Sequence, residues 1–98
     1  MTTKEWTVRI HLVEDGDVTR ARAELTVPGS SMKVFGHGSA RRNPVDRPVP
    51  EIGDELAVGR ALEDLALHVH DVAVDDFVDL AGPVDPVRRD DHSAWWSP

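Results

Sequence analysis

The chain has 98 residues, of which 40% are hydrophobic and 30% charged, a balance typical of one small globular domain. It contains no cysteine, which excludes disulfides, thiol nucleophiles and thiolate metal sites, and it has no apolar run of the roughly 18 residues needed to span a bilayer. The net charge of −7 argues against the uniformly basic surface of simple nucleic-acid-binding domains.

The first half of the chain has the alternating pattern of antiparallel strands. Residues 5–14 alternate apolar and polar side chains with the period of two of a half-buried strand. The turn signal Asp15-Gly16-Asp17 separates them from a second strand at 18–27, and Pro28-Gly29-Ser30 leads into a third strand at 32–41. We therefore expect a three-stranded meander with one buried face and one solvated face.

The third strand carries two glycines on one side. Gly36 and Gly38 share a face with Val34 and Ala40, and glycine inside a strand is typical of close approach by another backbone or of a bulge. We assign this side to the following helix. The alternate side chains of the strand then belong to the solvated face, together with Arg41.

A stiff loop and a long helix follow the strands. Pro44, Pro48 and Pro50 each fix φ and lack an N–H, so residues 41–49 are neither helix nor central strand. Proline and acidic residues in a first turn predict a helix start at Pro50. The helix is expected to reach about Val72, with an apolar stripe of Val58, Leu62, Leu65, Val69 and Val72.

Two further features of the helical half lead to expectations. Gly59 costs up to about 1 kcal/mol inside a helix, and we expect close packing on the sheet to be its reason. A second, short helix is predicted after Asp75 as its cap, ending at Gly82-Pro83. Residues 1–82 thus form a single α+β domain, and residues 83–98 an extended C-terminal tail in which Trp95 and Trp96 are expected to dock on the domain or on a dimer mate.

Four segments form a long and specific pattern: Thr19-Arg20-Ala21-Arg22-Ala23, Ala40-Arg41-Arg42-Asn43-Pro44 with Asp46-Arg47, Val49 to Ala57, and Arg60-Ala61-Leu62. This pattern resembles an actinobacterial family of small proteins of unknown function with a double-stranded-RNA-binding-domain-like (dsRBD-like) fold, the DUF1876 family. The resemblance covers roughly residues 5 to 81 and implies an α+β fold and a tendency to dimerise. It implies no reaction and no catalytic residues. His37 departs from the pattern, because an apolar residue is expected there.

Charge is unevenly distributed along the chain. Residues 1–50 hold eight Lys or Arg and six Asp or Glu, whereas residues 51–98 hold three and twelve. One interpretation is that the helical surface is simply acidic and solvated. The other is a basic sheet face backed by acidic helices, and a local basic patch can bind phosphate even on an acidic protein.

The basic residues of the first half are the candidate binding site for RNA or a protein partner: Arg9, Arg20, Arg22, Arg41, Arg42 and Arg47. Arginines on one face supply phosphate contacts without reading sequence. His11 and His37 are expected on the same face, as is Phe35, the one candidate for stacking on a base. The alternative interpretation is that these arginines pair with local acids such as Glu24, or with acids across a dimer interface.

Other chemistry has no positive support. His68 and His70 are two residues apart on a helix and point to different faces, so they do not form a chelating pair, and we expect no metal and no cofactor. The motif Phe35-Gly36-His37-Gly38-Ser39 is neither a nucleophile elbow nor a dinucleotide fingerprint. The acid pairs at 63–64 and 75–76 suit a solvated helix face and a cap, so we expect no catalytic residues and no enzyme.

The sequence therefore predicts a small binding protein that acts as a homodimer, with no membrane association and no small-molecule substrate. Residues 1–8 contain no apolar signal region, so we expect it in the cytoplasm. The leading hypothesis is an accessory factor of the stress or stationary-phase type that contacts RNA or the ribosome through the basic sheet face. The alternative is a protein-binding or regulatory homodimer without nucleic-acid contact.

Overall fold

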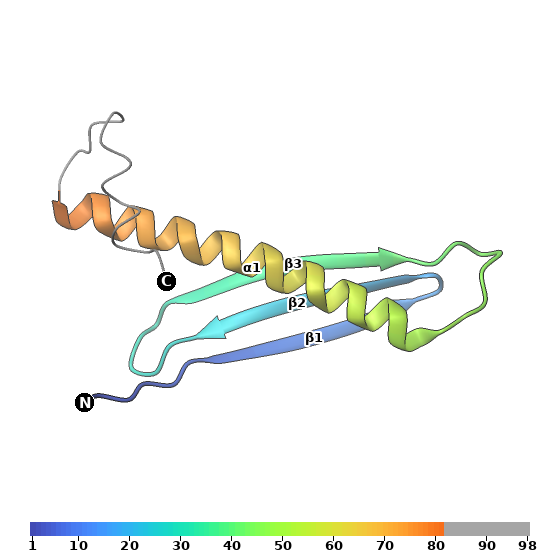
Figure 1. The fold of residues 1–98 in the computed structure, drawn as a ribbon, viewed down its shortest axis with the longest axis horizontal. Coiled ribbons are helices and arrows are strands. Elements are labelled where there is room, and N and C mark those ends of the chain that lie inside the picture. Colours follow the sequence, from blue (N-terminus) through green and yellow to red (C-terminus); the bar gives the residue numbers. More distant parts are fainter. Residues whose placement is uncertain (82–98) are drawn as a thin grey trace.

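The computed structural model describes residues 1–81, which form one sheet and one helix. The strands run antiparallel in the order β1-β2-β3, and the helix lies across one face of the sheet (Figure 1). The elements are β1 (Thr7–Asp15), β2 (Val18–Thr26), β3 (Lys33–Arg41) and α1 (Pro50–Ala81). This arrangement confirms the expected α+β meander followed by a long helix. The predicted tail at 83–98, with Trp95 and Trp96, lies outside the described residues.

Both strand connections contain a tight turn with a glycine at positive φ. Asp15 pairs with Val18, and Gly16 has φ 60°, as the first central residue of a type II′ hairpin turn requires. Gly29 has φ 78° after Pro28, and the Ser30 N–H donates to the Val27 carbonyl at 3.1 Å, which fits a type II turn. These turns fix the register of all three strands.

The glycines of β3 lie against the backbone of α1, as the sequence predicted. A Cβ at Gly36 would overlap backbone atoms of Ala61 and Leu65, and a Cβ at Gly38 would overlap those of Ala57 and Ala61. The sheet therefore admits the helix at a distance that only glycine on β3 allows. The third strand has the predicted register.

The residues that α1 turns toward the sheet are smaller than predicted. Ala57 and Ala61 are fully buried and Leu65 nearly so, whereas Leu62 of the expected stripe is 41% exposed. Because the helix backbone rests on two glycines, no room remains at the contact for a bulky side chain. Larger residues pack on the flanks instead: Val58, Val69 and Val72.

The structure also corrects the expectation that Gly59 packs closely on the sheet. A Cβ at Gly59 would meet no atom within 4 Å, so close packing does not explain this glycine. We expect Gly59→Ala to raise the free energy of unfolding by about 0.5–1 kcal/mol, because alanine has a higher helix propensity and fits the open space. Urea denaturation at fixed protein concentration measures the change, and a lower midpoint would show a constraint at Gly59 beyond helix propensity.

The helix is continuous from Pro50 to Ala81, and no second helix begins at Asp75. Asp75 lies within α1 and is exposed. Residues 60–81 contain neither glycine nor proline, so nothing forces the backbone out of the helical conformation. The residues assigned to a separate short helix are therefore the last turns of α1. Within residues 1–81, no helix is long and apolar enough to cross a membrane.

The helix covers the sheet unevenly. It packs mainly on β3 and β2 and touches β1 little. The core accordingly lies between α1 and the two later strands, and consists of Ala21, Ala23, Leu25, Val34, Ala40, Ala57, Ala61 and Leu65. On β1, the helix-side residues Val8 and Leu12 remain 41% and 43% exposed.

Candidate functional site

The face of the sheet that points away from α1 carries no layer from residues 1–81. We call it the open face. Strand register assigns its side chains, because residues paired directly across antiparallel strands lie on the same side. The open face contains two acidic residues, Asp15 and Glu24, and five basic residues: Arg9, Arg20, Arg22, Lys33 and Arg41.

Two rows of the open face run straight across the three strands. One row is His11, Arg22 and His37, all exposed. The neighbouring row places Glu24 between Arg9 and Phe35. The Arg22 guanidinium lies 5.7 Å from the centre of the Phe35 ring, within the range of a cation–π contact. The predicted gathering of arginines, histidines and Phe35 on one face is therefore present.

The arginines of the open face are largely unneutralised. Glu24, the expected local partner, forms its ion pair with Lys33 at 3.2 Å and not with an arginine. Within residues 1–81, Arg9, Arg20 and Arg41 form no ion pair. Sequence reasoning did not single out Lys33, although its period-of-two spacing from Phe35 and His37 assigned it to this side.

The two layers of the fold carry opposite charge. In α1 one arginine accompanies nine acidic residues: Glu51, Asp54, Glu55, Glu63, Asp64, Asp71, Asp75, Asp76 and Asp79. Since α1 lies on the other side of the sheet, the acidic layer and the open face are separated by the core. The net negative charge of the chain therefore coexists with a locally basic surface.

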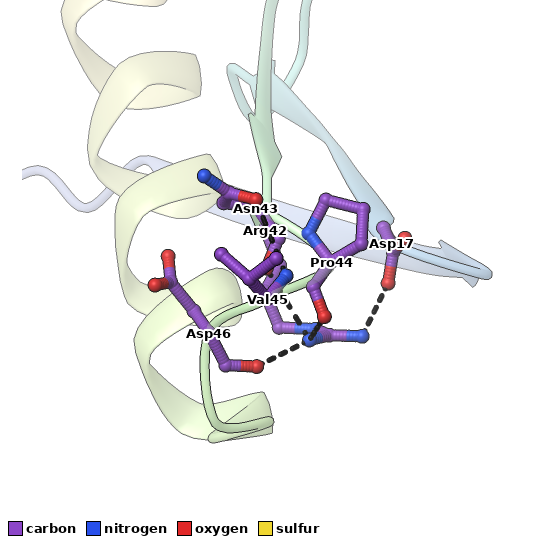
Figure 2. Close-up of polar contacts among 6 residues, drawn as sticks. All are labelled: Asp17, Arg42, Asn43, Pro44, Val45 and Asp46. Atoms are coloured by element: carbon purple, nitrogen blue, oxygen red, sulfur yellow. Dashed lines mark hydrogen bonds and ion pairs between the residues drawn. The ribbon is translucent and has the colours of Figure 1, made fainter.

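Arg42, one of the predicted binding arginines, is occupied within the loop that follows β3. Its guanidinium pairs with Asp17 at 2.5 Å and donates to the carbonyls of Asn43, Pro44 and Asp46 (Figure 2). The Arg42 backbone N–H also donates to the Asp17 carbonyl at 2.8 Å. These bonds join the loop to the β1–β2 turn, which is a structural role.

A cleft of about 490 Å³ lies where this loop meets the β1–β2 turn and the first turns of α1. Arg41, Arg42 and Arg47 line it together with the acids Glu14, Asp17 and Asp46. The structure therefore divides the predicted arginines: Arg9, Arg20 and Arg22 lie on the open face, Arg42 and Arg47 line the cleft, and Arg41 belongs to both. The mixed charge of the cleft favours no ligand class.

The two edges of the sheet differ. Along the outer edge of β3, side chains of α1 bond to the free backbone groups: Arg60 Nη1 donates to the Ser39 carbonyl at 2.7 Å. The His37 N–H donates to Asp64 Oδ2 at 2.8 Å. His68 Nδ1 lies 2.6 Å from the Phe35 carbonyl oxygen. Because a carbonyl oxygen only accepts hydrogen bonds, this contact requires the proton on Nδ1. The residues at 60, 64 and 68 are each about one helical turn apart, and together they cover part of the outer edge of β3.

The histidines and acids of the described chain do not assemble into a metal centre. Asp64 and His68 approach each other at 3.8 Å, but residues 1–81 contain no group of three side chains that could hold an ion. The Asp64 and His68 side chains instead bond to backbone groups at the outer edge of β3. The described chain thus presents one coherent polar surface, the open face, and one uncovered strand edge, that of β1.

Proteins similar to this chain include uncharacterized mycobacterial proteins. The profile of the family described as Rv2632c-like matches residues 4–84. The uncharacterized protein Mb1767 of Mycobacterium bovis is 47% identical over 73 residues, which span 74% of this chain and 76% of that protein. The uncharacterized protein Rv2632c of Mycobacterium tuberculosis is 54% identical over 56 residues, 56% of this chain and 58% of that protein. The crystal structure of Rv2632c superposes with a TM-score of 0.75 at 33% identity, over 86% of this chain and 98% of that one.

Proposed function

This chain belongs to the Rv2632c-like family, and we propose that it is a binding protein whose open face contacts the phosphate backbone of structured RNA, free or in the ribosome, as a stress or stationary-phase accessory factor would. The observation that carries the proposal is a set of three arginines, Arg9, Arg20 and Arg41, that stand beside Arg22 on the open face and form no ion pair within residues 1–81. Phosphate contacts of this kind position RNA without reading its sequence.

The chemistry of the open face favours double-stranded or folded RNA over single strands. Readers of single strands stack successive bases on exposed aromatic rings. Among residues 1–81, Phe35 is the one aromatic ring on the open face, and Arg22 already contacts it. Backbone recognition of a folded RNA needs cations at fixed positions, and a sheet holds its side chains in a regular array. A dsRBD-like relationship of the fold would agree with this substrate class.

The second candidate function is a protein-binding or regulatory homodimer without nucleic acid. The observation that favours it is the uncovered apolar side of β1, where Val8 and Leu12 are exposed. A three-stranded sheet with one unpaired edge also gains stability when another chain covers that edge. The edge of β1 and the open face are different surfaces, so dimerisation by itself does not decide between the two candidate functions.

Titration of the full chain against a folded RNA hairpin at two salt concentrations tests the RNA proposal. With three to four phosphates neutralised, we expect a log–log salt slope of about −3, so that affinity falls roughly 60-fold between 50 and 200 mM salt. An unstructured single strand of equal length is the control and should bind more weakly. Absence of saturable binding to the hairpin at 50 mM salt would reject the proposal.

A further inference from the structure

We propose that the outer edge of β1 pairs antiparallel with β1 of a second copy of this chain, joining two three-stranded sheets into one six-stranded sheet. This inference deepens the homodimer candidate by naming its surface and geometry. It does not depend on RNA binding, and its tests are separate from the RNA titration.

The first argument is that side chains of α1 obstruct such pairing at β3. One outward backbone group of each of Phe35, His37 and Ser39 is bonded to a side chain of α1. A strand added to this edge would have to displace three hydrogen bonds, two of which involve ionic side chains. The helix therefore protects one edge of the sheet from association and leaves the other for it.

The second argument is that β1 presents an unpaired row of backbone groups. Asp15 and Val18 close a two-residue hairpin and so form a hydrogen-bonded pair. Pairs alternate along the ladder, which turns the N–H and C=O groups of Val8, Ile10 and Leu12 away from β2. No side chain or backbone group elsewhere in residues 1–81 bonds to them.

The third argument is the apolar surface beside that edge. Val8 and Leu12 point to the helix side of the sheet, but α1 lies over β2 and β3 and leaves both about two fifths exposed. Trp6, just before the strand, has the same parity and is 52% exposed. A paired strand would place its own helix-side residues against this row and remove it from water.

The sequence of β1 favours a second copy over another strand. Arg9 lies in the first half of β1, and Glu14 and Asp15 close the second half. In an antiparallel pair, the basic half of each copy faces the acidic half of the other, and the apolar row meets its own equivalent. The two-fold axis stands perpendicular to the sheet, so both helices lie on one side and both open faces merge into one basic surface on the other.

Cysteine cross-linking tests the edge directly, because the chain contains no cysteine of its own. His11 and His37 are both exposed in the same row of the open face, one on β1 and one on β3. We expect a short bis-maleimide reagent to join two copies of H11C and not two copies of H37C. Equal cross-linking of the two variants, or cross-linking of H37C alone, would overturn the proposal.

Light scattering tests the state of the unmodified chain. We expect wild type at micromolar concentration to have twice the mass of the 10.8 kDa monomer. Leu12→Lys should return it to a folded monomer, because an inward-pointing lysine on an edge strand opposes pairing. Leu67→Lys, at a 64% exposed position of α1, is the matched control and should remain a dimer. A monomeric wild type or a dimeric Leu12→Lys would contradict the assignment.

The RNA titration separates this proposal from the proposed function. Leu12 is on the helix side, so a monomeric Leu12→Lys keeps every basic residue of the open face. If the open face binds RNA, the monomeric variant should bind RNA with the salt dependence expected of a single chain. It should lose only the additional affinity that two joined open faces give the dimer. Failure of dimerisation with intact RNA binding would overturn the edge assignment alone.

Discussion

Gly36→Val is expected to lower the free energy of unfolding by about 3 kcal/mol or more, at the upper end of the cost of overpacking a core. The valine Cβ would overlap the α1 backbone at Ala61 and Leu65, and backbone cannot turn aside as a flexible side chain can. The helix must therefore move off the sheet, which opens the contact between buried alanines and β3. For a domain of this size the corresponding loss of melting temperature is about 12–24 °C.

Alanine substitutions isolate the cause of this loss. Gly36→Ala adds only the Cβ and should still destabilise by at least about 1 kcal/mol, whereas Gly59→Ala adds the same atom in open space and should stabilise. Thermal or urea unfolding at one protein concentration compares the three variants. Unchanged midpoints for both substitutions at Gly36 would mean that the glycine side of β3 does not contact α1.

This contact shows why the architecture was accessible from the sequence. Two glycines at a spacing of two, on one side of a strand, have few explanations other than close backbone approach. Once that side is assigned to the helix, the direction of every side chain on β3 follows, and the hairpin register adds β1 and β2. The open face could therefore be predicted residue by residue, Arg41 included.

The side of α1 that faces the sheet was predicted less well, because large apolar residues dominate the pattern by which a buried helix face is recognised. Val58 and Leu62 dominate the sequence pattern, but the contact point is occupied by Ala57 and Ala61. The signal that could have corrected the stripe was on β3: a helix lying on glycines needs small residues opposite them. The prediction of a second short helix was also wrong. Asp75 can act as an N-cap only where a helix begins, and here it lies inside the continuous helix α1.

Tertiary roles of polar residues were not readable from one sequence. Arg42 carries the charge of a phosphate-binding residue, yet its guanidinium bonds to loop carbonyls and to Asp17. Asp17 lies in a turn more than twenty residues away in the sequence, so this contact could not be predicted locally. The sequence pattern assigned Asp64 to the solvated helix face and gave His68 no role beyond a histidine pair that does not chelate. The spacing of both residues from Arg60 nevertheless follows one flank of the helix. The angle at which α1 crosses the sheet decides which flank of the helix meets an unpaired strand edge. The sequence pattern does not specify that angle.

Replacing Arg9, Arg20 and Arg22 together by glutamate is expected to abolish binding to the RNA hairpin, with a loss of at least about 100-fold at 50 mM salt. Each substitution removes a cation and adds an anion on the open face, so attraction to phosphate becomes repulsion. Filter binding or sedimentation with wild type alongside measures the loss. Because Arg9→Glu puts a second carboxylate directly opposite Glu24, a parallel variant with three glutamines controls for folding.

The glutamine variant separates charge from fold. All three arginines are exposed, and of their contacts only the Arg22–Phe35 cation–π interaction is lost, so its free energy of unfolding should fall by about 1 kcal/mol or less. Its log–log salt slope should be shallower by about three, one for each phosphate contact removed. Replacing Glu55 and Glu63 of α1 by glutamine is the opposite control, and affinity should stay equal or rise slightly because repulsion decreases. If either triple variant binds as wild type does, Arg9, Arg20 and Arg22 do not carry the binding, and the cleft lined by Arg41 and Arg47 is the next surface to test.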